Sequence, residues 1–168
     1  MTSETFAKPA VGAIIEKDIN GVKHILVQKR QKNNGENGLI EMPAGKIRDF
    51  ENIFDALKRE VKEETGLKIT NIIGEDYQII KTGSYSTIDF SPFCITQNLA
   101  GGYSLILFTF ICKGEGKIYK KSDESSDIHW LEADKLRLLF EKYPEKIFPM
   151  HMNSLKKYFG RLDKKKGN

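Results

Sequence analysis

The chain has 168 residues, the length of one ordinary globular domain, and 39% of them are hydrophobic. Its net charge of +4 suits an anionic ligand such as a phosphate compound and is too small to favour a nucleic-acid-binding protein. No apolar run approaches the roughly 20 residues of a membrane span, and the N-terminus lacks the pattern of a secretion signal. We therefore expect one domain over residues 1–168, in a cytoplasmic protein with no membrane partner.

The first predicted elements are two strands, over residues 10–16 and Val22–Arg30, joined by an Asn-Gly turn pair. A polar, glycine-rich loop follows at residues 33–38. Residues 39–47 form a short segment with one proline, and a charged helix comes directly after it. The first third of the chain therefore predicts a hairpin that leads into a helix.

The rest of the chain alternates between strand and helix patterns. Four strands are expected, over residues 69–80, 84–98, 104–113 and 128–131. Helices are expected over residues 133–143 and 148–162, followed by a basic flexible tail at about 161–168. The segment LILFTFIC is the most apolar of the chain and predicts a central strand that is buried on both faces. Together these elements indicate an α+β fold with a mixed β-sheet core flanked by helices.

The helix expected within residues 45–67 places three carboxylates beside its apolar face. At about 100° per residue, one apolar stripe suits packing on a sheet: Ile53, Phe54, Leu57 and Val61. A second arc overlaps one edge of that stripe and carries Glu60, Glu63 and Glu64. Like charges at this spacing repel, and partial burial adds a desolvation cost, so we expect a cation beside them. Carboxylate oxygens suit a hard divalent cation, Mg²⁺ or Mn²⁺.

The alternative is a solvated helix whose charges pair along its surface. Asp55, Arg59 and Glu63 have the i, i+4, i+8 spacing of such pairs. The flanking residues decide between the two interpretations. The spacing G-x5-E-x7-REV-x-EE-x-GL over residues 45–67 resembles the complete Nudix box.

The resemblance implies the Nudix fold, an α/β/α sandwich, and a hydrolase that cleaves the pyrophosphate of a nucleoside diphosphate linked to another moiety. It implies that Mg²⁺ or Mn²⁺ is held by three glutamates and a backbone carbonyl: Glu60, Glu63, Glu64 and Ala44. Arg59 would act with them by orienting the carboxylates through charge-assisted hydrogen bonds. Three further residues would provide a backbone turn, a helix start and a helix C-cap, respectively: Gly45, Glu51 and Gly66.

The resemblance leaves the general base open between a glutamate of the box and one from a downstream loop. That loop would lie between Lys113 and Trp130, and Glu124 is the preferred candidate in it because it precedes the strand expected at 128–131. The alternative for Glu124 is an ordinary acidic loop residue. The histidines show no metal-binding spacing and are expected to be structural: His24, His129 and His151.

The run E-x-P-A-G-K that begins at Glu41 resembles that of ADP-ribose and ADP-sugar pyrophosphatases. That branch usually has a Pro-Gly pair about sixteen residues after the box, where this chain has Lys-Thr-Gly-Ser at 81–84. Arg30, Glu41 and Phe93 are predicted to contact the substrate. Phe93 and two other aromatic residues, Phe90 and Tyr103, are candidates for stacking on a base, with burial in the core as the alternative for each of the three.

We therefore predict a Mg²⁺-dependent pyrophosphohydrolase with a small-molecule nucleotide substrate, preferably ADP-ribose-like. Two alternatives stay open: a (deoxy)nucleoside triphosphate pyrophosphohydrolase and a non-catalytic, ligand-sensing Nudix domain. An RNA-end hydrolase would need a stronger basic track with exposed aromatic residues, so no nucleic-acid partner is favoured. A homodimer is compatible with the sequence, which does not require one.

Overall fold

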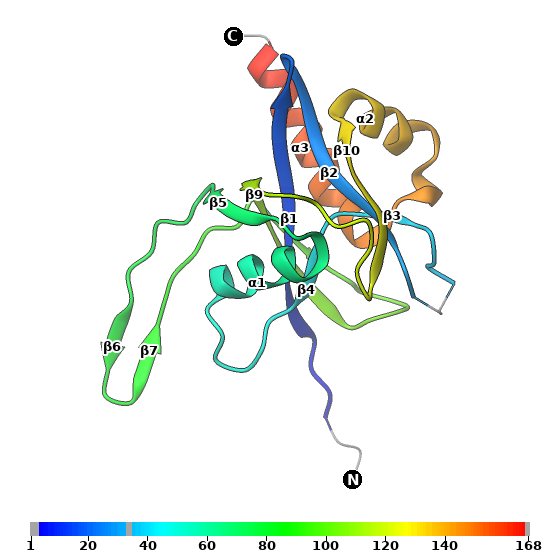
Figure 1. The fold of residues 1–168 in the computed structure, drawn as a ribbon. Coiled ribbons are helices and arrows are strands. Elements are labelled where there is room, and N and C mark those ends of the chain that lie inside the picture. Colours follow the sequence, from blue (N-terminus) through cyan, green and yellow to red (C-terminus); the bar gives the residue numbers. More distant parts are fainter. Residues whose placement is uncertain (1–3, 33–34, 167–168) are drawn as a thin grey trace.

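The computed structural model describes residues 4–32 and 35–166, and a mixed β-sheet lies at its centre (Figure 1). Five strands form the main path of the sheet, in the order β10 (Ser125–Glu132), β2 (Val22–Arg30), β1 (Lys8–Ile19), β9 (Leu105–Glu115) and β5 (Lys68–Ile72). Three short strands pair beside this path: β3 (Ile40–Glu41) with β2, β4 (Ala44–Lys46) with β1, and β8 (Cys94–Gln97) with β9.

The apolar strand β9 lies beside β1 at the centre of the sheet. These two strands run parallel, with Ala13 opposite Phe110, whereas the other strand pairs of this sheet are antiparallel. Phe110 and Cys112 belong to the core on one face of the sheet, and Ile111 belongs to the core on the other. The prediction of a central strand buried on both faces is therefore confirmed.

Helices cover both faces of the sheet (Figure 1). The apolar side of α1 (Ile53–Thr65) packs on one face, and α2 (Ala133–Lys142) and α3 (Met152–Lys166) pack on the other. Two 3₁₀ turns connect α2 to α3: η1 (Pro144–Lys146) and η2 (Pro149–His151). The predicted mixed sheet flanked by helices is thus confirmed. Over residues 4–32 and 35–166, no helix has both the length and the apolar composition needed to cross a membrane.

Both ends of α1 are capped by residues that the sequence provides locally. The Asn52 side chain accepts a hydrogen bond from the Phe54 N–H at 2.9 Å. At the other end Gly66 adopts φ 82°, and its N–H donates to the Lys62 carbonyl at 3.0 Å. Gly66 is therefore the C-cap that the sequence predicts.

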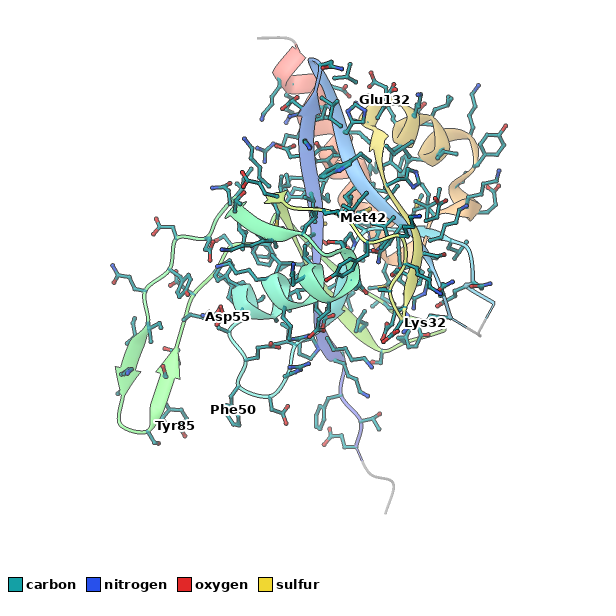
Figure 2. The ribbon with its side chains drawn as sticks, in the orientation of Figure 1. Lys32, Met42, Phe50, Asp55, Tyr85 and Glu132 are labelled. Carbon is teal, nitrogen blue, oxygen red and sulfur yellow. The ribbon has the colours of Figure 1, made fainter. Side chains whose placement is uncertain are left out.

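Two predicted strands are shorter than expected. β5 ends at Ile72 and not at residue 80, and the strand expected over 84–98 is divided into β7 (Tyr85–Thr87) and β8. β7 pairs with β6 (Ile80–Thr82) in a hairpin that projects from the body of the molecule (Figure 1), and Tyr85 points outward from it (Figure 2). The residues of β6 and β7 are exposed, because the hairpin has no core face on which to pack.

The flexible tail expected at about 161–168 is also corrected. Helix α3 continues through Lys166, while residues 167–168 lie outside the described part of the chain. Leu162 packs against the core on the α2 and α3 side of the sheet. Asp163 forms an ion pair with Arg137 of α2, with 2.8 Å between Oδ1 and Nη1. These tertiary contacts hold the basic segment in the helix.

Gly160 in α3 allows a direct test of helix propensity. A Cβ at this position meets no atom within 4 Å, so we expect Gly160→Ala to stabilise the protein by about 0.5–1 kcal/mol. The melting temperature should rise by roughly 1–4 °C in a thermal unfolding experiment. Gly66→Ala is the matched comparison, because its Cβ would lie 2.8 Å from the Lys117 carbonyl oxygen at φ 82°, and it should lower the melting temperature.

Candidate active site

A pocket of about 290 Å³ opens beside the N-terminal part of the Nudix-like segment. Part of its wall comes from β4 and α1 and includes Ala44, Gly45, Lys46 and Glu60. The strands β2 and β3 contribute Arg30 and Glu41. The remaining wall comes from later parts of the chain and includes Tyr103, Leu107, Glu124, Phe148, Met150 and His151.

The three glutamates of α1 differ strongly in exposure. Glu64 is only 7% exposed, the Glu60 side chain is 16% exposed and the Glu63 side chain is 54% exposed. The carboxylates therefore lie along the border of the buried helix face, as the helical spacing predicts. A fully solvated surface helix is excluded by Glu64 and Glu60, although Glu63 does form the surface pair with Arg59, at 3.3 Å.

Glu64 is a buried carboxylate held by two donors. Its Oε2 accepts hydrogen bonds from Gln28 Nε2 at 2.9 Å and from the Ala44 N–H at 3.1 Å. Burial raises the pKa of Glu64 to about 8, and the charges of Glu41 and Glu60 act in the same direction. A carboxylate with this raised pKa favours a cation beside it, because the cation would stabilise its charged form.

Arg59 joins the other carboxylates of the segment. Its Nε and Nη2 donate to the two oxygens of Glu51 at 2.7 and 2.8 Å, and its Nη1 donates to Glu60 at 2.5 Å. The hydrogen bonds from Arg59 lower the pKa of Glu51 to about 2. Burial raises the pKa of Glu60, against the effect of Arg59, and the charges of Glu63 and Glu124 contribute to this rise. Arg59 thus lies where the sequence places an orienting residue.

The prediction of a backbone turn at Gly45 is wrong. The residue lies within strand β4, opposite Val11 of β1, and its φ is not positive. A Cβ at this position would lie 2.0 Å from Cδ of Glu60. Glycine is needed because the Glu60 carboxylate packs directly against the backbone, a contact that no local pattern predicts.

The residues around the pocket fit a hard divalent cation. Glu60 and the Ala44 peptide line the pocket, and Glu64 does not line it but accepts a hydrogen bond from the Ala44 N–H; all three provide oxygen atoms, the ligand type that Mg²⁺ and Mn²⁺ prefer. Across residues 4–32 and 35–166, no three carboxylate, imidazole or thiol groups already converge as a metal site. Arg59, which binds Glu60 and Glu63, provides the positive charge beside them in this arrangement.

Glu124 lies at the same pocket as Glu60. It is an exposed residue directly before β10; its side chain forms an ion pair with Lys32, and its carbonyl accepts from the Gln31 N–H at 2.8 Å. The fold thus brings the preferred base candidate from the downstream loop to the carboxylates of α1, although 60 residues separate Glu124 from Glu64 in the sequence.

Arg30 and Glu41 both line the pocket and bind each other. Arg30 Nη1 donates to Glu41 Oε2 at 2.8 Å, and its Nε donates to Glu36 at 3.0 Å. The Arg30 guanidinium also lies over the ring of Phe148, 4.0 Å from its centroid. Two carboxylates therefore share the charge of Arg30, and aromatic rings of Phe148 and Tyr103 lie against its guanidinium at the wall of the pocket.

The prediction of Phe93 as a substrate contact is not supported by its position. Phe93 does not line the pocket, and its ring packs against the core on the α2 and α3 side of the sheet, with Lys157 Nζ 5.0 Å from its centroid. Phe90 is partly buried and packs against the core on the α1 side of the sheet, in edge contact with Phe108. Of the aromatic candidates, Tyr103 is the one that reaches the pocket.

Sequence reasoning missed the C-terminal wall of the pocket, which is formed by Phe148, Met150 and His151. The Phe148 N–H donates to the Ile40 carbonyl at 2.8 Å and so fixes this segment beside β3. His151 is fully buried, and neither of its ring nitrogens has a hydrogen-bond partner within the described residues. The segment FPMH carries no periodicity or motif that would reveal this position.

His151 should make the protein sensitive to acid. Burial lowers the pKa of His151 to about 3 from 6.5, so the unfolded chain takes up a proton below pH 6.5 that the folded protein does not. Stability is complete above pH 6.5 and falls as the pH decreases toward 3, by about 2 kcal/mol between pH 7 and pH 5 from this group. Urea unfolding at both pH values should show a smaller loss for His151→Phe than for the wild type, and an unchanged loss would contradict the assignment. His129→Gln, at a partly exposed histidine, is the control.

Comparison with known proteins agrees with this geometry. The family model of the NUDIX domain matches residues 7–150. The ADP-ribose pyrophosphatase of Methanocaldococcus jannaschii is 32% identical over 146 residues, which cover 85% of this chain and 72% of that protein. A NUDIX hydrolase from Nitrosomonas europaea has a TM-score of 0.60 at 20% identity, over 92% of this chain and 89% of that one. The NUDIX domain of Shewanella oneidensis NrtR, solved with ADP ribose, has a TM-score of 0.66 at 12% identity, over 95% and 91%.

These matches and the arrangement of α1 define the class of the protein. The chain belongs to the Nudix family, because the family model covers most of its length and a relative matches it at 32% identity. It is a hydrolase of the Nudix pyrophosphatase class, as the box predicts.

Proposed function

We propose that the protein hydrolyses the pyrophosphate of a nucleoside diphosphate linked to another moiety, with Mg²⁺ or Mn²⁺ and with an ADP-ribose-like compound as substrate. One observation carries the proposal: a single pocket has two kinds of wall. Glu60 and the β4 backbone form a side rich in oxygen atoms, whereas Tyr103, Leu107 and Phe148 form an apolar and aromatic side. Such a pocket suits a ligand that joins a metal-bound pyrophosphate to an organic ring.

The residues at the oxygen-rich side of the pocket and the α1 residues next to them have proposed roles. Glu60, Glu63, Glu64 and the Ala44 carbonyl hold the cation, which would neutralise the phosphoryl oxygens and lower the pKa of the attacking water. Arg59 orients Glu60 and Glu63, to which it already donates hydrogen bonds. Lys46, which lines the pocket, adds a positive charge that suits the phosphate groups.

Glu124 is the proposed general base, since it lies at the pocket and is close enough to Glu60 to influence its pKa. We expect Glu124→Gln to lower kcat by roughly 10²-fold with little change in KM, because the substrate contacts remain in place. Steady-state kinetics would measure both constants. If Glu124→Gln keeps the wild-type kcat, Glu124 is not the general base, and a glutamate of the Nudix box takes that role.

The similarity to a protein named ADP-ribose pyrophosphatase supports the proposed substrate class. The NUDIX domain of Shewanella oneidensis NrtR, which has a similar fold and was solved with ADP ribose, also supports this substrate class. The complete set of box carboxylates favours hydrolysis over ligand sensing alone. Arg30 and Glu41 are the proposed substrate contacts on the β2 and β3 side of the pocket.

A hydrolysis screen tests the proposal. Wild type and Glu64→Gln would be assayed with Mg²⁺, and with EDTA, on ADP-ribose, nucleotide sugars, dinucleoside polyphosphates and (deoxy)nucleoside triphosphates. We expect Mg²⁺-dependent turnover of the ADP-ribose class by the wild type alone. A clear preference for triphosphates would favour the alternative substrate class. Binding of ADP-ribose without turnover of any compound would favour a ligand-sensing domain and reject catalysis.

A further inference from the structure

Gln28 connects the two buried carboxylates of the site. It lies on β2, opposite Glu41 of β3, and its side chain is 1% exposed. Its Nε2 donates to Glu64 Oε2 at 2.9 Å and approaches Glu41 Oε1 at 3.4 Å. Since Arg30 donates to the other oxygen of Glu41, a continuous row of hydrogen bonds runs from Arg30 through Glu41 and Gln28 to Glu64.

A neutral amide is the side chain that suits this position between two acids. Its two N–H groups can serve one carboxylate each, which offsets their desolvation and their mutual repulsion without adding a charge. A lysine or arginine here would neutralise the carboxylates and compete with a cation for the same oxygens. The orientation of the Gln28 amide follows from its neighbours, because the opposite orientation would turn its Oε1 toward two acceptors.

The hydrogen bonds to Glu64 are directed to one of its two oxygens. Gln28 Nε2 and the Ala44 N–H both donate to Oε2, and no hydrogen bond to Oε1 occurs in the described part of the chain. The two donors come from different strands, so together they fix the plane of the carboxylate as well as its position. Oε1 is thereby left available to a ligand.

We propose that Gln28 is a positioning residue of the metal site: it fixes the Glu64 carboxylate so that Oε1 faces the cation, and it ties this orientation to the Arg30 and Glu41 side of the pocket. The inference rests on the proposed function in that it assumes a cation at Glu64. It does not depend on which pyrophosphate compound is cleaved, nor on whether turnover occurs.

The test is a measurement of Mn²⁺ binding to the substrate-free protein, by electron paramagnetic resonance of the free ion. Gln28→Met keeps a similar side-chain volume and removes both donors, so we expect its Mn²⁺ affinity to fall 10–100-fold. For any substrate that is turned over, kcat of Gln28→Met at a fixed Mn²⁺ concentration should be lower than that of the wild type, because less of the variant holds the metal. This kcat should recover in part as the Mn²⁺ concentration is raised. The KM for the substrate at saturating Mn²⁺ should change little. If Gln28→Met lowered kcat only through a loss of packing, a higher Mn²⁺ concentration would not restore kcat.

Two further variants keep the test decisive. Gln28→Asn retains an amide that is one methylene shorter, preserves the polar character of the site if Gln28→Met fails to fold, and should also weaken Mn²⁺ binding. Thr109→Val is the control, because Thr109 is a buried polar residue of β9 that does not line the pocket. Its Mn²⁺ affinity should equal that of the wild type.

Wild-type Mn²⁺ affinity in Gln28→Met, or in Gln28→Asn where Gln28→Met is unfolded, would overturn the inference and reduce Gln28 to a packing residue. Failure of the proposed function gives a different result. In that case the wild type would bind Mn²⁺ and hydrolyse none of the compounds. The Mn²⁺ affinity of the Gln28 variants would still be lower than that of the wild type.

Discussion

Glu64→Gln is expected to lower kcat by roughly 10³-fold and, at the same time, to stabilise the metal-free protein at alkaline pH. The activity falls because an amide is a poor ligand for a hard cation. The stability rises because burial holds the pKa of Glu64 at about 8, above its usual 4.5. Between these pH values the folded protein keeps a proton that the unfolded chain has released, so the stability from this group is lost as the pH rises.

The opposite signs of the two effects exclude unfolding as the cause of inactivity. Glutamine cannot ionise, so the free energy of unfolding of the variant should exceed that of the wild type by about 4 kcal/mol in urea at pH 8 with EDTA, and by about 1 kcal/mol at pH 5. Glu63→Gln makes the same chemical change at an exposed position and should alter stability by less than about 0.5 kcal/mol. A Glu64→Gln protein that keeps its turnover, or that is less stable at pH 8, would contradict the assignment of Glu64.

Gly45→Ala is expected to lower kcat/KM by roughly 10²-fold with little loss of stability. The new Cβ would lie 2.0 Å from Cδ of Glu60, so the carboxylate must leave its position beside Arg59. The displaced group is the end of a flexible side chain, so the β4 backbone need not shift. Steady-state kinetics and thermal unfolding on the same preparation would separate the two effects.

Gly114→Ala is the matched control for this variant. Gly114 is also a strand glycine, but its Cβ would meet its nearest atom at 3.4 Å, an oxygen of the Lys68 backbone. It should leave kcat/KM unchanged. A Gly45→Ala protein with wild-type kcat/KM would show that the contact between Gly45 and Glu60 has no role in catalysis.

The helix that carries the site was predictable because its information is local. Apolar residues at helical spacing predict the buried face of α1, and the C-cap conformation of Gly66 follows from its lack of a side chain. The burial of β9 on both faces was predictable for the same reason, because an apolar run too short to span a membrane suits a strand that lies between two layers of helices. In both cases the residues that form the element also determine which side of it is buried.

Other features depend on segments that meet only in the folded chain. Gly45 could be read as a special backbone position, but its true partner, the carboxylate of Glu60, is 15 residues away. Phe93 is an aromatic residue that could stack on a base, but its ring packs against the core on the α2 and α3 side of the sheet, where Lys157 of α3 donates to its carbonyl. The strand expected to continue from β5 to residue 80 gives way to a projecting hairpin, since residues 80–87 have no core to cover.

By itself the sequence determined the Nudix box, the helix that displays its carboxylates, and with them the class of reaction. Only the tertiary structure decided which other groups surround those carboxylates: Gln28 on Glu64, Arg30 on Glu41, and His151 in the pocket wall. The physical reason is the range of the interactions. Helical periodicity and capping act over a few residues, whereas the order of strands in the sheet places side chains from distant segments within hydrogen-bonding distance.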